Sequence, residues 1–283
     1  MRFSVSGFAV RALSIAFAVS AVLTAVCHAQ GRAAPMSNDA AVDEQQTELH
    51  QLTDVQKQGG ATDPKEVNAY KAFYKADEPA KKIQLGDDFL QKYPKSALAE
   101  PVDVGLLNVY YAKQDWKNVY ATADSALVLK PDDIYVLTTV GWVIPHVSQP
   151  SDSDADQLLD KAEAYAKHAI EVIPAMTKPS YMSDAQFAAL KTQSAIQAHS
   201  ALGLVYFRRE DYENSAKELQ QSTPSTANPD STDLYVLGVD LENLKRFAEA
   251  ADAYGRCGQI AGPLQDRCKQ SADAAKKQAP QSK

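Results

Sequence analysis

The sequence has little glycine, no concentrated stripe of basic residues and none of the common catalytic glycine motifs. It contains 12 glycines among 283 residues, and this scarcity together with many alanines favours helices. The formal net charge is −7, and an acidic chain repels phosphate backbones, so we expect no nucleic-acid partner. Because a P-loop, a dinucleotide fingerprint and a nucleophile elbow are all missing, we predict a non-catalytic protein without cofactor or small-molecule substrate.

The only long apolar run lies near the start of the chain, at residues 12–27, after two arginines. This run is shorter than the roughly 20 residues that a membrane-spanning helix needs. A charged start, an apolar middle and a small-x-small end are typical of a secretory signal, so we predict a signal peptide at 1–29, cut after Ala29. Lipid anchoring at Cys27 is not expected, because Val26 is too large for the preceding position. The predicted location is the periplasm or the cell exterior, with peripheral association with the envelope as an option.

The rest of the chain divides by composition. Residues 30–62 are mostly small, polar or charged, which predicts a flexible linker in which a short helix near its end remains an option. Asp63-Pro64 reads as a helix N-cap followed by proline at the first helical position. We expect a helical repeat domain at 63–278 and a disordered tail at 279–283.

One short pattern occurs twice in the second half of the sequence. The first copy contains Leu202-Gly203, Tyr206, Ser215 and Leu219, and the second contains Leu237-Gly238, Leu241, Ala250 and Tyr254. Each copy describes two amphipathic helices that form a hairpin. Glycine costs about 1 kcal/mol in a helix interior, so we expect its repetition to reflect close approach of the partner helix.

This pattern resembles the tetratricopeptide repeat (TPR), whose unit recurs every ~34 residues. Leu107 and Gly141 occupy the corresponding position of two earlier units. The segment Phe89 to Ala99 is similar to the turn of TPR proteins of the outer-membrane-assembly and Tol-Pal coordinator type. The resemblance implies an all-α solenoid of four stacked helix-turn-helix units, ending in a capping helix after Gly262.

Two insertions depart from the repeat length, at Pro145 to Asp154 and at Ala175 to Thr192. Inside the second, Ser183 to Gln186 matches a capping box, so this insertion should contain extra helical turns that lead into the helix at 197–208. Both insertions are expected at solvent-exposed edges, because stacked helices cannot absorb them.

The resemblance also implies a concave groove that binds a segment of another protein. The groove residues carried over from the repeat are Asn108, Tyr111, Tyr135, Thr138, Trp142, Leu204, Phe207, Arg208, Tyr235, Glu242 and Asn243. Aromatic residues with interleaved polar ones suit a protein-binding surface. For Tyr135, Phe207 and Tyr235 an alternative stays open, namely packing between neighbouring repeats. A second alternative is a structural subunit of an envelope complex that uses the convex face or the insertions.

A calcium-modulated protein is the weakest alternative. Asp152, Asp154, Asp156 and Glu163 have the spacing of a calcium-binding loop, but Gln157 stands where such a loop needs glycine. The five histidines have no spacing that would bring two together on one helix face, so we predict no metal site.

Two cysteines, Cys257 and Cys268, would remain after signal cleavage. An exported chain meets oxidising conditions, so we predict a disulfide between them. The alternative is two separate small core residues.

Overall fold

The computed structural model describes residues 52–53, 55–57, 60, 63–179, 181–224 and 229–279. These residues form eleven α-helices and one 3-10 helix, with no strand among them. The predicted all-helical fold is therefore confirmed, with helices that contact their neighbours in sequence order. The predicted signal peptide, most of the predicted linker and residues 280–283 lie outside the described part of the chain.

The chain divides into two compact units. The N-terminal unit comprises the described residues up to 140 together with 177–187, and the C-terminal unit comprises residues 141–176 and 188–279. Two helices, α7 (Ile134–Val147) and α9 (Asp184–Arg208), contribute residues to both units.

The N-terminal unit contains four complete helices that contact one another in sequence. These are α3 (Pro64–Tyr74), α4 (Pro79–Lys92), α5 (Ala99–Ala112) and α6 (Trp116–Leu129). Asp63 caps α3 as expected, because its carboxylate accepts a hydrogen bond from the Lys65 amide at 2.8 Å. Leu52 is buried in the first hydrophobic cluster, so the packed structure includes a residue from the segment assigned to the linker.

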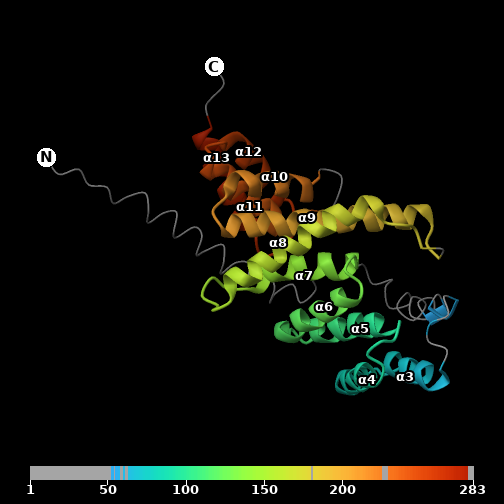
Figure 1. Cartoon of the computed structure of the whole chain (residues 1–283). Coiled ribbons are helices and arrows are strands. Elements are labelled where there is room, and N and C mark those ends of the chain that lie inside the picture. The colour runs from blue at the N-terminus through green and yellow to red at the C-terminus, as the bar shows by residue number, and fades with distance from the viewer. Residues whose placement is uncertain are drawn as a thin grey trace. The chain divides into compact units, whose positions relative to one another are not determined.

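The C-terminal unit contains the remaining helices, of which α10 to α13 contact one another in sequence order (Figure 1). Its elements, in addition to parts of α7 and α9, are α8 (Ala155–Val172), the 3-10 helix η1 (Ile173–Ala175), α10 (Tyr212–Ser222), α11 (Ser231–Asn243), α12 (Phe247–Cys257) and α13 (Gln265–Gln278). One continuous hydrophobic cluster extends from Leu204 to Ala275. The terminal helix α13 matches the predicted capping helix, and its buried positions include Ala272 and Ala275.

Three hairpins share one turn geometry. Gln114, Glu210 and Lys245 each adopt a positive φ, between 56° and 63°, directly after the first helix of a hairpin. The amide of the next residue then bonds back to the carbonyl five positions earlier, at 3.0 Å for Asp115, 3.0 Å for Asp211 and 2.8 Å for Arg246. This is the hydrogen-bond pattern of a Schellman turn, so the hairpins repeat in backbone geometry as well as in sequence.

Close helix approach explains the repeated glycines. A Cβ atom added at Gly203 would lie 2.5 Å from Cγ of Leu219, well inside van der Waals contact. At Gly238 an added Cβ would overlap the ring of Tyr254. The expected packing reason for both glycines is therefore confirmed.

The first insertion is shorter as a loop than the sequence indicated, and the second contains the expected extra helical turns. Pro145 lies inside the last turn of α7, which continues to Val147, so the first loop begins later than predicted. The capping box is confirmed, with Ser183 and Gln186 bonded reciprocally at 2.9 and 3.2 Å. From Asp184 the chain then continues as the single long helix α9, because nothing in its alanine-rich sequence interrupts the helix.

Candidate functional site

The residues predicted to line the groove differ in how accessible they are. Thr138, Leu204, Phe207 and Tyr235 are buried. Asn108, Tyr111, Tyr135, Trp142, Arg208 and Glu242 are partly buried, and Asn243 is exposed. Only the second and third groups present surface to a partner, so the predicted groove is smaller than the sequence implied.

Three predicted groove residues belong to the core of the C-terminal unit and correct the sequence prediction. Leu204, Phe207 and Tyr235 all lie in its hydrophobic cluster. Tyr235 packs against Tyr254 with ring centroids 5.6 Å apart, and the guanidinium of Arg267 lies 5.1 Å from its ring. For Phe207 and Tyr235 the alternative of packing between helices therefore holds. Thr138 is likewise turned inward and donates to the Ile134 carbonyl at 2.8 Å.

In the N-terminal unit, two of the predicted groove residues contact each other, one from α5 and one from α7. The hydroxyl of Tyr135 donates to the amide oxygen of Asn108. On the same helix as Asn108, Tyr111 packs edge-on against Trp116, with ring centroids 5.8 Å apart. These contacts hold the partly exposed aromatic rings in fixed orientations.

In the C-terminal unit, Trp142 and Arg208 are both joined to the end of α7. The Trp142 ring stacks on His146, with centroids 3.8 Å apart and planes inclined at 32°. Arg208 donates to the backbone carbonyls of Pro145 and Ser148, at 2.9 and 2.8 Å. The sequence therefore identified two residues that each contact the last turn of α7 or the residue after it, although it did not indicate His146.

Burial lowers the pKa of both basic groups near the end of α7. The pKa of His146 is lowered because the ring is buried, and Arg208 nearby acts in the same direction. Burial also lowers the pKa of Arg208, which the nearby Asp152 partly offsets. The lowered pKa favours the neutral form of His146, against which the Trp142 ring stacks. Arg208 binds the backbone carbonyls at the end of α7.

The last two groove residues engage their own hairpin. Glu242 accepts a hydrogen bond from the Tyr254 hydroxyl at 3.1 Å. The side-chain amide of Asn243 donates to the Val239 carbonyl at 2.9 Å. Their remaining acceptor atoms are available to a partner, because Glu242 is only partly buried and Asn243 is exposed.

The carboxylates of the calcium-like spacing have other interactions. Glu163 accepts from Lys167 at 2.6 Å and also pairs with Arg209. The Lys167 hydrogen bond is the main reason that the pKa of Glu163 is lowered. Asp152 accepts from the Gln149 amide at 2.7 Å. Within the described ranges, no group of three or more potential metal ligands comes together.

Several buried acids were missed by the sequence analysis. Asp240 and Asp233 on α11 and Asp103 on α5 are buried beside serine hydroxyls, and Glu100 lies near Lys130. Burial raises the pKa of Asp240 to about 8 and that of Asp103 to about 6. Asp240 could have been noticed as the one charged residue in the apolar run Leu234–Leu241.

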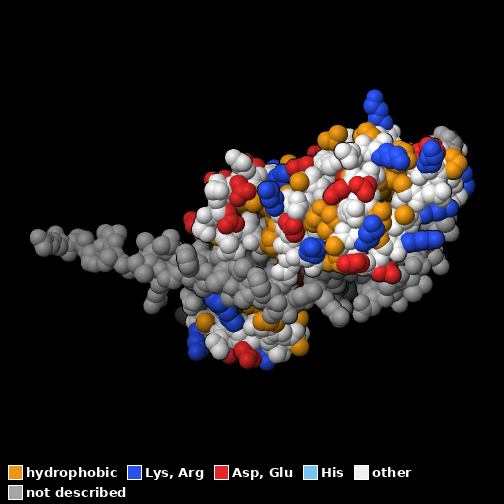
Figure 2. Space-filling view, turned by 90° about the horizontal axis from the view of Figure 1, so that it is seen from below, with side chains coloured by type: hydrophobic (Ala, Val, Ile, Leu, Met, Phe, Trp, Pro, Cys, Tyr) orange, Lys and Arg blue, Asp and Glu red, His pale blue; other side chains and the backbone are white. Residues whose placement is uncertain are grey.

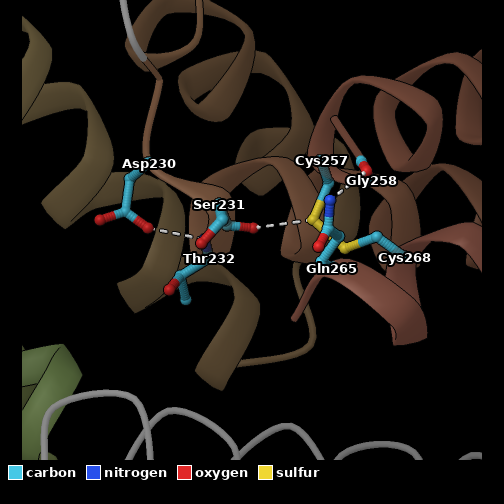
Figure 3. Close-up of a disulfide and its surroundings, with 7 residues drawn as sticks. All are labelled: Asp230, Ser231, Thr232, Cys257, Gly258, Gln265 and Cys268. Carbon is cyan, nitrogen blue, oxygen red and sulfur yellow. Dashed lines mark hydrogen bonds between the residues drawn. A yellow bond between two sulfur atoms is a disulfide. The ribbon is translucent and has the colours of Figure 1, made fainter. Parts of the chain in front are cut away.

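The two cysteines form the predicted pair. Their sulfur atoms are at disulfide bonding distance, and their Cα atoms are 5.7 Å apart. Figure 3 shows the pair linking α12 to α13, with the carbonyl oxygen of Ser231 3.4 Å from the sulfur of Cys257. The bond therefore joins the terminal helix to the last hairpin.

On the face shown in Figure 2, basic and acidic side chains are interspersed, with hydrophobic atoms between them. None of the helices that the structure describes is both long and apolar enough to cross a lipid bilayer. No protein-family model matches the chain, and no curated protein matches it significantly.

Proposed function

We propose that this chain is a non-catalytic TPR-like scaffold of the cell envelope that binds a segment of another protein. The repeated hairpin turns and the glycine contacts support a repeat architecture. Stacked hairpins of this type form extended surfaces on which other proteins bind.

The observation that carries the proposal is the fixed, partly exposed Trp142. Its ring stacks on buried His146 and therefore loses little conformational freedom when a partner covers it. Tryptophan is also among the residues most often found at the energetic centre of protein interfaces. Tyr111, oriented by Trp116, would add a second aromatic contact.

Polar groups would set the position of the bound segment. Glu242 and Asn243 retain acceptor oxygens beyond the contacts described above, and Asn108 retains the donors of its side-chain NH2 group. Arg208 is held by two backbone carbonyls, so it would contribute shape and positive potential at a fixed place. In the C-terminal unit, these groups suit an extended or helical segment with an apolar residue opposite Trp142.

A second candidate function is that of a structural subunit that uses other surfaces. Val128 and Leu129 near the end of α6 are 81% and 44% exposed, and Tyr181 in the second insertion is 38% exposed. Exposed large hydrophobic side chains of this kind are suited to contact another protein.

Site-specific photocrosslinking in intact cells tests both candidates. A photoreactive residue is placed at Tyr111, Trp142, Val128 or Tyr181, one position at a time, and the trapped protein is identified. Under the proposed function, the same protein is trapped at Tyr111 and Trp142 but not at the other two positions. Trapping at only Val128 or Tyr181 supports the second candidate, and trapping at none of the four contradicts both.

A substitution supplies the matched test. Trp142→Ala should abolish capture of that protein while the far-ultraviolet circular dichroism stays unchanged, whereas Trp142→Phe should retain part of the capture. Phe207 is unsuitable for this purpose, because it is buried and its truncation would leave a cavity. Undiminished capture by Trp142→Ala would show that the partner binds elsewhere.

A further inference from the structure

Asp240 occupies a buried position with an unusual set of neighbours. The residue is fully buried in α11. One of its carboxyl oxygens, Oδ2, lies 2.5 Å from the hydroxyl oxygen of Ser215, and the same hydroxyl lies 2.8 Å from the carbonyl oxygen of Gly203. The other oxygen, Oδ1, has no hydrogen-bond partner among the described residues.

The number of hydrogens available at the Ser215 hydroxyl shows which protonation state of Asp240 is consistent with both contacts. A serine hydroxyl has one hydrogen to donate. If Asp240 were ionised, its oxygen and the Gly203 carbonyl would both be acceptors, and one of these two short contacts would lack a hydrogen. A protonated Asp240 donates to Ser215, and Ser215 then donates to Gly203. Protonation also leaves only a neutral oxygen at the unpartnered Oδ1, which costs less than a buried charge.

Asp233 repeats this arrangement about two turns earlier in the same helix, α11. Its Oδ2 lies 2.7 Å from the hydroxyl of Ser222, which also lies 3.1 Å from the Leu219 carbonyl. Its Oδ1 accepts from Ser200 of α9 at 2.8 Å. Because Ser222 also has a single hydrogen, a proton on Asp233 allows both contacts of that hydroxyl to be hydrogen bonds.

Among the residues that the structure describes, the neighbours of both acids supply no compensating positive charge. The titratable groups that face Asp240 are Tyr212 of α10 and Tyr254 of α12. Asp233 faces Asp230, whose charge adds to the effect of burial in raising the pKa of Asp233 to about 7. No lysine, arginine or histidine among the described residues of α9, α10, α12 or α13 acts on the pKa of either acid.

We propose that Asp233 and Asp240 are protonated in the folded protein and together form a pH-sensitive latch that joins α11 to α9 and α10. Asp233 bridges Ser200 of α9 and Ser222 of α10, and Asp240 reaches Ser215 of α10. Loss of either proton places an unpaired negative charge in the core, which weakens these contacts. The latch is independent of the proposed binding function.

The direction of the pH dependence follows from linkage. In the unfolded chain both acids ionise near their ordinary pKa, whereas in the folded chain they hold their protons to higher pH. The contribution of these acids to stability is therefore complete below the ordinary aspartate pKa of about 4 and is lost as the pH rises from there to the folded-state pKa values. For each protonated acid the unfolding equilibrium constant increases about tenfold per pH unit within that window.

The test compares unfolding of the full chain and its variants between pH 6 and pH 8. In a Trp116→Phe background the fluorescence of Trp142 reports the C-terminal unit alone, because the chain has 2 tryptophans. Asp240→Asn keeps the shape and the donor to Ser215 but cannot ionise. We expect the slope of log unfolding constant against pH to decrease by about one for Asp240→Asn, while the exposed control Asp252→Asn leaves it unchanged.

An equal slope in Asp240→Asn and the parent protein would overturn the proposal. A measurement on the unsubstituted chain covers the case in which the variant fails to fold. With aspartate labelled by carbon-13 at its carboxyl carbon, at least two carboxyl signals of the folded protein should titrate above about pH 6, well beyond the ordinary aspartate range. If every aspartate titrates below that pH, the acids are not protonated and the latch does not exist.

Discussion

The two units bury acidic side chains in different ways. In the N-terminal unit, Glu100 and Asp133 share the ammonium group of Lys130, at 3.7 and 2.6 Å. In the C-terminal unit, Asp233 and Asp240 contact serine hydroxyls and no cation. The N-terminal pair therefore shares a cation that the C-terminal pair lacks, although Asp103 of the N-terminal unit also contacts a serine hydroxyl, that of Ser125.

The pKa values express this difference. Burial acts to raise the pKa of Asp133, but Lys130 outweighs it and holds the pKa below its ordinary value. Burial raises the pKa of Glu100 to about 7 although Lys130 opposes the shift. A single partly exposed lysine thus keeps one of its two acids ionised, whereas hydroxyl groups alone cannot do so for Asp233 or Asp240.

The units also differ in how they fill the space beside their glycines. In the N-terminal unit the ring of Phe73 serves two glycines, since Cβ atoms added at Gly86 and Gly105 would lie 2.9 and 2.7 Å from it. In the C-terminal unit each repeat glycine faces its own side chain. In the first case one ring is shared by two glycines, with Leu106 also 2.7 Å from the Cβ atom added at Gly86, and in the second case packing is distributed over separate side chains.

The largest expected effect comes from removing that single ring. Phe73→Ala should cost about 3–5 kcal/mol of stability, the range for truncating a buried aromatic residue. Urea unfolding followed by Trp116 fluorescence in a Trp142→Phe background measures this in the N-terminal unit. The matched control, Tyr74→Phe, removes only the hydroxyl that donates to the Pro101 carbonyl at 2.7 Å and should cost about 1 kcal/mol. Equal losses would contradict the role given to Phe73.

Removing the cysteine pair should affect one unit only. Both cysteines lie in the C-terminal unit, and residues 34–140 and 177–187 contain none. Replacing both Cys257 and Cys268 by alanine should cost about 2–3 kcal/mol, as expected for a short closed loop. Urea unfolding monitored by Trp142 should show this loss, and unfolding monitored by Trp116 should not change. A loss reported by Trp116 would mean that the two units do not unfold separately.

Two glycines of the last hairpin give a paired test of distributed packing. Gly238→Ala should cost about 1–3 kcal/mol, because the added methyl group overlaps the Tyr254 ring. Gly255→Ala should instead stabilise by about 0.5–1 kcal/mol, because an added Cβ meets no atom within 4 Å. Thermal unfolding of both variants measures the sign and size of each stability change. The same sign of change in both would refute the packing explanation.

The smallest expected effect is a difference between the two units in how their stability depends on pH. Raised pKa values favour folding at low pH, and this contribution is lost up to about pH 6 for Asp103 and about 7 for Glu100, but up to about 8 for Asp240. Between pH 7 and 8 the C-terminal unit should therefore lose about 1.4 kcal/mol while the N-terminal unit changes little. The two single-tryptophan backgrounds measure both units in the same buffers, and parallel losses would remove the distinction.

Features set by local rules could be predicted from the sequence. The cap at Asp63, the capping box at Ser183 and the glycine contacts at Gly203 and Gly238 all depend on residues within one helix or one hairpin. The shared hairpin turn was not recognised. It could have been, because an aromatic residue follows Asp115, Asp211 and Arg246 in each copy.

Features set by distant contacts could not be predicted. The burial of Phe207 and Tyr235 depends on which helices cover them, and a repeat pattern gives the same residues whether they face a groove or a core. The serine beside Asp240 lies 25 residues earlier in the chain. A pattern read within single helices therefore gives no reason to expect a hydroxyl group beside Asp240.

The turn shared by the three hairpins makes them exchangeable parts. Because Gln114, Glu210 and Lys245 give the chain the same change of direction, a hairpin could be duplicated or transplanted at these points without redesigning the connection. A protein engineer could thus lengthen the chain one module at a time, with Asp115 and Asp211 as natural splice points.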